Sequence, residues 1–279
     1  MNLPYIFIFD IDGTIIGEIH HQILEWELLK IIDPILIKQY DITDVLNNGM
    51  LRPNFKEFIE FINKKYKNVE IFVYTNSSYI WAKYGIIPNI QKIVNNKINE
   101  PYFTREDSND RQKLLGNLYD NIIEKLIPKY SSLKLDKNKE FIFQNQLVFI
   151  DDIKENLKDY PQKQILCPEY TKCDCYDMKS RLIDKYYIKE DKFDNEKVLK
   201  FFEENYLPIY NIKGSLLQQD KYFQELLELR LQRRQEILNF NDTFFKSLIS
   251  ILDKEKTLKL DVKTIMRINE KLNKINSIE

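Results

Sequence analysis

The sequence predicts an α/β protein in which helices cover both faces of a parallel sheet, followed by an all-helical C-terminal extension. Three short segments are rich in β-branched and aromatic residues, which is typical of strands buried inside a parallel sheet. These segments are residues 6–10, 69–75 and 147–150. Segments with helical periodicity separate them, and strands that alternate with helices form βαβ units. Strand signals end near residue 190, so we expect an α/β domain over residues 1–189 and a helical extension over 190–279.

Helices are expected between the strands, and proline and glycine mark their limits. The first helical segment lies within residues 18–37 and is broken by Pro34. A second helix begins near Pro53, because proline suits the first helical turn. The apolar residues that share one face of this helix are Phe55, Phe58, Ile59, Ile62 and Tyr66. A third helix is expected to end at a Gly85 C-cap, and a fourth spans residues 111–128.

A short fourth strand is expected near residues 164–167, and the rest of the chain is expected to be helical. The helical segments of the extension are residues 195–206, 215–240 and 242–254. Asp261 is a typical N-cap for a final helix. The residues of that helix expected to face inward are Val262, Ile265, Met266, Leu272 and Ile275.

Composition narrows the class of protein. Of 279 residues, 43% are hydrophobic and 30% charged, so a packed core is expected rather than disorder. A net charge of −1 argues against a large nucleic-acid surface but is compatible with a local basic patch. No signal peptide or membrane-spanning run is expected. Cys167, Cys173 and Cys175 are odd in number with no histidine near them. They favour reduced thiols in a cytoplasmic or nuclear protein and leave metal binding by them open.

Polar residues follow the ends of three predicted strands. They are Asp10 and Asp12, Thr75 and Asn76, and Asp151 and Asp152. Ligands of open α/β sheets bind at the carboxyl ends of the strands, so we expect these residues to meet. Four converging carboxylates repel one another unless a cation binds between them, and all-oxygen ligands suit Mg²⁺. A magnesium site made of acids, with a hydroxyl and a lysine nearby, indicates phosphate chemistry.

Each motif also has a purely structural interpretation. Asp10 and Asp12 could form a strand-end turn that Gly13 bends. Thr75 and the later acid pair could cap the helices that follow them. The occurrence of all three motifs, each at the end of a strand, favours the chemical interpretation.

These motifs resemble those of the haloacid dehalogenase (HAD) superfamily. Asp10-x-Asp12-Gly13-Thr14 is similar to its motif I, Thr75 to motif II and Asp151-Asp152 to motif IV. The Leu51-Arg52-Pro53 helix start and the segment 102–107 further resemble the Fcp/Scp-type phosphatases, also called NLI-interacting-factor-like. The resemblance covers roughly residues 5–180 and implies a HAD-like Rossmannoid fold.

The resemblance implies a role for each motif residue. Asp10 would be the nucleophile and form an aspartyl-phosphate. Asp12 would protonate the leaving oxygen and later activate water. Thr75 would hydrogen-bond a phosphoryl oxygen. Lys113, with Arg111 as the weaker alternative, would be the motif III lysine that neutralises the nucleophile and the phosphate.

The same resemblance implies a Mg²⁺ cofactor and contacts to the substrate. The residues that would hold Mg²⁺ are Asp10, Asp12 through its backbone carbonyl, Asp151 and Asp152. Asn76 and Arg105 would bind the substrate. The segment between motifs I and II is modest in length, so we expect an open site that admits macromolecules.

We therefore expect a Mg²⁺-dependent phosphatase that acts on phosphoserine or phosphothreonine in proteins. One alternative is a nucleic-acid end-processing phosphatase or nucleotidase, and another is a non-catalytic scaffold protein with a HAD core. Nucleic acid is not the favoured partner, and no membrane partner is expected. The C-terminal helices are expected to dock a protein partner or to mediate self-association.

Overall fold

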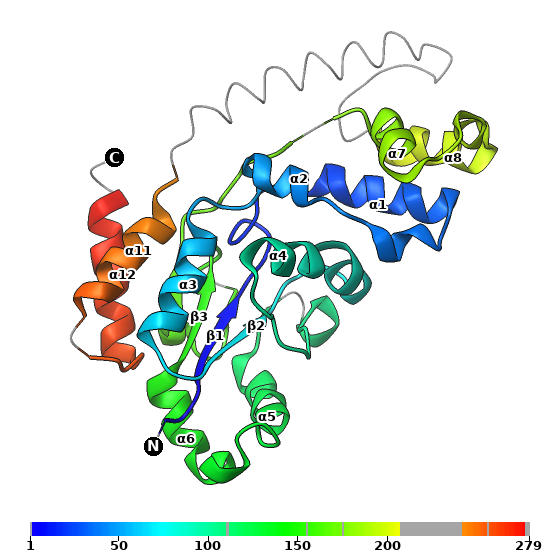
Figure 1. Ribbon diagram of the computed structural model, residues 1–279. Helices are drawn as coiled ribbons and strands as arrows, with labels where there is room; N and C mark the ends of the chain where they lie inside the picture. Colours follow the sequence, from blue (N-terminus) through cyan, green and yellow to red (C-terminus); the bar gives the residue numbers. More distant parts are fainter. Residues whose placement is uncertain are drawn as a thin grey trace.

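A four-stranded parallel sheet forms the centre of the computed structural model, which describes residues 2–109, 112–154, 156–174, 176–206, 242–255 and 257–276. The strand order is β2–β1–β3–β4, and every neighbouring pair is parallel. The strands are β1 (Tyr5–Phe9), β2 (Val69–Val73), β3 (Leu147–Asp151) and β4 (Gln164–Leu166). The four predicted strands and the α/β fold class are confirmed (Figure 1).

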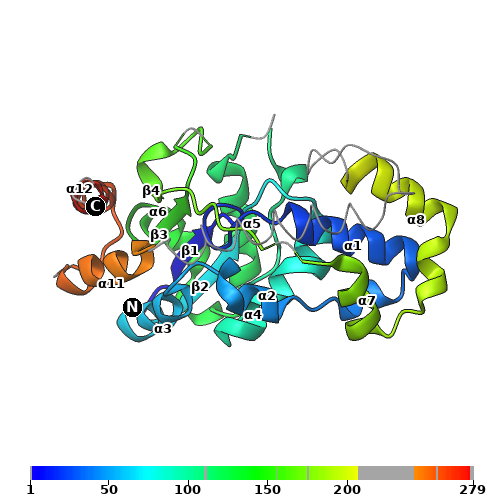
Figure 2. The ribbon, with the colours of Figure 1, turned by 90° about the horizontal axis from the view of Figure 1, so that it is seen from above.

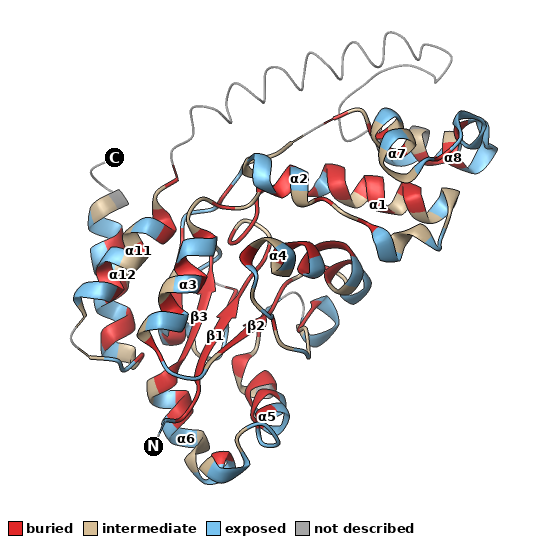
Figure 3. Cartoon of the chain, in the orientation of Figure 1, coloured by how far each residue is buried: buried red, intermediate tan, exposed pale blue. Residues whose placement is uncertain are grey.

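Helices cover both faces of this sheet, because alternate residues of a strand point to opposite sides. Phe7 and Phe9 face α3 (Phe55–Lys65), where their ring centroids lie 6.3 and 6.1 Å from that of Phe58. Ile6 and Ile8 belong to a second buried cluster with α5 (Leu115–Leu126) and α6 (Leu135–Gln146). The buried residues in Figure 3 accordingly follow the sheet and the inner faces of its helices.

Two predicted helix limits are wrong, each for a local reason. Gly85 does not end a helix, because the turns at Trp81–Ile86 continue into α4 (Ile87–Val94). A Cβ on residue 85 would lie 2.2 Å from Cε3 of Trp81, so glycine here makes room for the indole. Helix α5 begins at Leu115 rather than at residue 111, because the backbone of Lys113 is hydrogen-bonded to that of residues 156 and 158.

A group of helices lies beyond the carboxyl ends of the strands; we call it the helical layer (Figures 1 and 2). It consists of α1 (His20–Ile32), α2 (Thr43–Val45), α7 (Met178–Tyr186) and α8 (Glu196–Phe201). Helix α1 ends before Pro34, as expected, and α8 packs against it. Helices α1 and α2 belong to the segment between motifs I and II, whereas α7 and α8 follow motif IV.

The last two described helices pack on the sheet domain itself. In α11 (Phe244–Lys254), the ring of Phe245 lies 5.1 Å from those of both Phe55 and Phe58 on α3. Helix α12 (Val262–Asn276) packs against β4, and Asp261 accepts a hydrogen bond from the Thr264 amide as expected of an N-cap. Figures 1 and 2 show α11 beside α3, and α12 packs against α11.

One inward position of α12 is wrong. Met266 is 54% exposed, whereas Ile268 is buried, because spacings of three and four residues from Ile265 lead to 268, 272 and 275. The predicted helix over 215–240 lies outside the described residues, and the domain boundary at 190 stays a prediction. Within the part of the chain that the structure describes, each helix is too short or too polar to cross a membrane.

Candidate active site

The motif I segment folds as a tight turn directly after β1. The amide of Asp10 donates to the carbonyl of Ile150 on β3, so the turn starts from the sheet edge. The carbonyl of Ile11 accepts from the amides of Ile15 and Ile16, at 2.9 and 3.1 Å. Gly13 has a φ of +74°, and a Cβ there would lie 2.7 Å from Oδ2 of Asp152. Glycine is therefore required at this position by both conformation and space.

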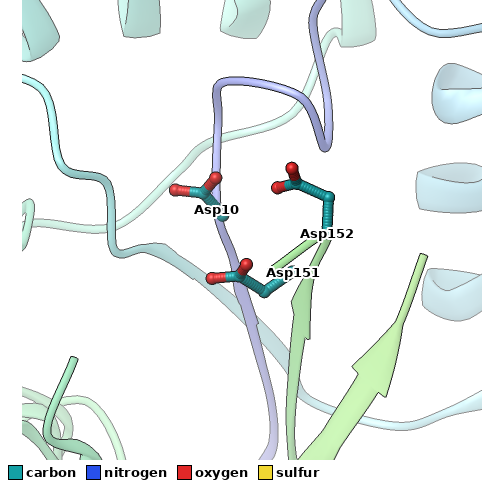
Figure 4. Close-up of side chains that lie close together, drawn as sticks. All are labelled: Asp10, Asp151 and Asp152. Carbon is teal, nitrogen blue, oxygen red and sulfur yellow. The ribbon is translucent and has the colours of Figure 1, made fainter. Parts of the chain in front are cut away.

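Three carboxylates converge at the ends of β1 and β3. One oxygen from each of Asp10, Asp151 and Asp152 lies within 4.8 Å of the other two (Figure 4). Nζ of Lys113 is fully buried and lies 2.6 Å from Oδ1 of Asp10 and 2.8 Å from Oδ2 of Asp151. We call these four residues the acid cluster. It holds three acids and one lysine, so its formal charge is −2 when all are ionised.

Burial and mutual repulsion dominate the titration of the acid cluster. Burial raises the pKa of Asp10; Lys113 lowers it and Asp151 raises it again, and the net pKa lies well above its ordinary value. Burial lowers the pKa of Lys113, but Asp10 and Asp151 more than reverse this, so the ammonium stays charged. Burial, followed by repulsion from Asp151, raises the pKa of Asp152. Burial is thus the largest cause of the raised pKa values of Asp10 and Asp152, whereas the raised pKa of Lys113 reflects its two negative neighbours.

The acid cluster fits a divalent cation such as Mg²⁺. The atoms that its three carboxylates offer to a metal ion are all oxygens, which small hard cations prefer. Oδ1 of Asp152 accepts a hydrogen bond from the Thr14 hydroxyl at 3.0 Å, which orients the carboxylate towards the other two acids. Among the described residues this is the group of acids, histidines and cysteines whose spacing suits a metal ion. The side chain of Asp12 is not part of it.

Asp12 is held apart from the acid cluster by hydroxyl groups. Its Oδ2 accepts hydrogen bonds from Ser77 Oγ at 2.8 Å and from Thr75 Oγ1 at 3.2 Å. Its Oδ1 is buried without a partner among the described residues. Burial raises the pKa of Asp12, and the hydrogen bonds from Ser77 and Thr75 partly oppose this. One oxygen is thus anchored, whereas the other makes no hydrogen bond to the described residues.

A cavity of about 500 Å³ opens beside these residues. Asp12 and Asp152 form part of its wall, and Asn76 and Arg105 line it on the β2 side. Nε of Arg105 donates to the backbone carbonyl of Asn76 at 2.9 Å. The start of α1, including His20, contributes to the wall, so the helical layer borders the site.

The sequence model of the NLI interacting factor-like phosphatase family matches residues 5–199. The chain belongs to this family. It is a HAD-superfamily phosphatase of the Fcp/Scp type and a phosphoric monoester hydrolase. No curated protein and no solved structure matched the chain.

The phosphatase brings the predicted site residues together in two sets. Asp10, Lys113, Asp151 and Asp152 form the acid cluster. Asp12 and Thr75 are hydrogen-bonded to each other, whereas Asn76 and Arg105 line the cavity. The role assigned to each of them stays a prediction. Arg111, the alternative to Lys113, lies outside the described residues.

Two residues of the phosphatase site were missed from the sequence. Ser77 donates to Asp12, and Asn156 donates through Nδ2 to Oδ2 of Asp151 at 3.0 Å. The carbonyl of Asn156 also accepts from the Lys113 amide at 2.7 Å, which brings the lysine to β3. Ser77 stands two residues after Thr75 in a polar run, a signal that could have been used. Asn156 has no comparable signal.

The two described cysteines of the phosphatase, Cys167 and Cys173, are not part of the group of carboxylates whose spacing suits a metal ion. Cys167 is a buried free thiol whose Sγ lies 3.7 Å from Oγ1 of Thr14. Burial raises its pKa to about 12, so the thiol is protonated at neutral pH. Cys173 is partly exposed. Cys175 lies outside the described residues.

Proposed function

We propose that this phosphatase requires Mg²⁺, forms an aspartyl-phosphate on Asp10, and acts on phosphoserine or phosphothreonine in proteins. The observation that carries the proposal is the acid cluster, in which Asp10 lies beside a buried lysine and two further carboxylates. Such a set of opposed charges supports attack by a carboxylate on a bound phosphoryl group.

In the first half of the reaction, an oxygen of Asp10 bonds to phosphorus and the bond to the leaving oxygen breaks. Asp12 gives its proton to that oxygen, a transfer supported by the raised pKa of its buried carboxyl. In the second half, Asp12 takes a proton from water, the water oxygen bonds to phosphorus, and the bond to Asp10 breaks. Inorganic phosphate and the free carboxylate result.

Other residues of the chain bind charge and fix orientation. Lys113 neutralises the nucleophile and one face of the phosphoryl group. Ser77 and Thr75 hold one oxygen of Asp12, which directs the unpartnered oxygen to the substrate. Asp10, Asp151 and Asp152, with the backbone carbonyl of Asp12, would hold Mg²⁺. When bound, the ion supplies charge neutralisation to the phosphoryl oxygens.

The lining of the cavity favours a protein substrate over nucleic acid. Besides the site acids, Glu18 and Glu169 line it, whereas His20 and Arg105 are the basic side chains of the same wall. Carboxylates at the mouth repel a polyanionic backbone, which binds best to clusters of lysine and arginine. A phosphopeptide carries its negative charge mainly at the phosphate and suits this mixed surface.

The proposal is tested by hydrolysis of an aryl phosphate with and without Mg²⁺. Wild type is expected to turn over only with the ion, Asp10→Asn to be inactive, and Asp120→Asn, an exposed acid on α5, to be unaffected. Brief acid quenching with a phosphopeptide is expected to trap a phosphorylated protein whose modified peptide contains Asp10.

A panel of phosphopeptides, nucleotides and end-phosphorylated oligonucleotides identifies the substrate class. Higher kcat/KM on phosphopeptides supports the proposal. Higher kcat/KM on oligonucleotides or nucleotides would contradict the protein substrate and favour a nucleic-acid phosphatase or nucleotidase. Absence of turnover of every phosphoester would favour the scaffold alternative. Turnover without a phosphorylated Asp10 would remove the covalent mechanism.

A further inference from the structure

The C-terminal part of the chain contributes a buried ion pair to the motif I turn. The guanidinium of Arg52 donates from Nε to Oδ1 of Asp242 at 3.0 Å and from Nη2 to Oδ2 at 2.7 Å. The side chains of both residues are almost inaccessible, at 0% for Arg52 and 5% for Asp242. A bidentate pair in this environment fixes the plane of the guanidinium.

The third nitrogen of that guanidinium reaches the backbone of motif I. Nη1 of Arg52 donates to the carbonyl of Thr14 at 3.2 Å and to that of Gly13 at 3.5 Å. The amide of Arg52 also donates to the carbonyl of Ile15 at 2.8 Å. Three successive carbonyls of the turn are therefore held by one residue, whose orientation Asp242 determines.

Aromatic rings enclose the same guanidinium. Its Cζ lies 4.8 Å from the ring centroid of Phe244 and 5.4 Å from that of Tyr170. Phe244 adjoins Asp242 and its amide donates to Oδ1 of that residue at 3.2 Å, so the start of α11 holds both the charge and a ring against Arg52. The amide of Tyr170 donates to the carbonyl of Gly13 at 2.8 Å.

The turn passes this constraint to the acid cluster. The Thr14 hydroxyl donates to Oδ1 of Asp152 at 3.0 Å and accepts from the Asp152 amide at 3.1 Å. Thr14 is the residue whose carbonyl Arg52 holds, so a displaced guanidinium displaces the hydroxyl that orients Asp152. A shift of about 1 Å in a supporting contact can lower a rate by about 100-fold.

We propose that Asp242, which lies beyond the family match, is a positioning residue of the active site that acts through Arg52 and the motif I turn. The C-terminal helices are then part of the catalytic apparatus and not only a docking element. The expected change in kcat rests on the proposed function. The expected loosening of the motif I turn does not depend on it.

The test compares Asp242→Asn with Leu248→Ala in the full-length protein. Asp242→Asn keeps the shape of the side chain but removes the charge that orients Arg52. Leu248→Ala removes a buried side chain of the same helix α11 away from that contact, and so controls for loss of stability. Both are measured well below their unfolding midpoints, so that the folded fraction is the same.

Three measurements separate positioning from stability. Asp242→Asn is expected to lower kcat for an aryl phosphate about 10- to 100-fold with KM little changed. Calorimetric titration is expected to show weaker Mg²⁺ binding. Hydrogen exchange of peptides covering residues 10–17, measured in the absence of Mg²⁺ and substrate, is expected to be faster in Asp242→Asn than in wild type. Leu248→Ala is expected to leave all three near the wild-type values.

A second variant covers the case in which Asp242→Asn does not fold. Phe244→Leu keeps an apolar side chain but removes the ring beside Arg52, and is expected to shift the same three measurements in the same direction by less. Unchanged hydrogen exchange in residues 10–17 overturns the inference, as do equal effects in Leu248→Ala. If wild type itself has no phosphatase activity, the proposed function fails. The hydrogen exchange of residues 10–17 still shows whether Asp242 holds the motif I turn in place.

Discussion

Replacing Lys113 by methionine tests the electrostatics of the acid cluster. The ammonium is fully buried, 2.6 Å from Asp10 and 2.8 Å from Asp151, and methionine removes the charge with little change in shape. Two buried carboxylates then lack their cation, and the folded protein relieves the repulsion by binding one additional proton. Removing one partner of a buried ion pair typically costs about 3–5 kcal/mol.

The pH dependence gives this prediction a magnitude and a sign. Protonating a carboxyl with an ordinary pKa of about 3.9 costs about 1.4 kcal/mol for each pH unit above that value. The free energy of unfolding that Lys113→Met loses is therefore about 4 kcal/mol at pH 7 and about 1.5 kcal/mol at pH 5. Lys113 lowers the pKa of Asp10 in the folded state, so its removal raises that pKa further, and the stability of the variant relative to wild type falls as pH rises.

Urea unfolding followed by circular dichroism, in EDTA at several pH values, measures this loss. Lys158→Met, the same substitution at an exposed lysine nearby, is the control and is expected to change stability by less than about 0.5 kcal/mol. A loss in Lys113→Met below about 1 kcal/mol at neutral pH, or one that does not vary with pH, would refute the reasoning.

Three further outcomes are expected. Gly13→Ala should lower kcat by about 100-fold, because residue 13 has a positive φ and a Cβ would collide with Asp152; activity near wild type would contradict the geometry of the turn. Iodoacetamide should modify Cys173 before Cys167, because the pKa of the buried Cys167 thiol is about 12; peptide mass spectrometry shows the order, and the reverse order would exclude that environment. Mg²⁺ at about 100 times its Kd should stabilise wild type by about 2.7 kcal/mol in thermal unfolding, and the same gain in Asp152→Asn would place the ion elsewhere.

The sheet and the motif I acids could be predicted from the sequence because their signals are local. Buried parallel strands are continuous apolar runs, and the runs before Asp10 and Asp151 continue without a break until they end at these acids. The carboxyl ends of parallel strands meet at one edge, so convergence followed from the fold class alone. Lys113 was selected through the family resemblance, and it lies in contact with Asp10.

The remaining features depend on tertiary contacts that no local pattern encodes. Helix α6 was missed because its segment is rich in charge and its buried face is narrow. Gly85 was misread because the same residue type serves both helix ends and close packing, here against Trp81. The pairing of Arg52 with Asp242 joins positions 190 residues apart and is visible only when the chain is folded.

The environments of Asp10 and Asp12 suit the two acids to opposite tasks although they stand two residues apart. The pKa of Asp10 is governed by burial and by charged neighbours, Lys113 and Asp151, so a cation bound at the cluster would lower it and favour the ionised carboxylate that the proposed mechanism requires. Burial raises the pKa of Asp12, and the hydrogen bonds from the hydroxyls of Ser77 and Thr75 are the largest opposing causes, so the carboxyl can carry a proton. The tight turn produces this difference, because it directs one carboxylate to β3 and the other to Thr75 and Ser77. Neighbouring carboxyl groups with different environments are the arrangement that acid–base catalysis requires.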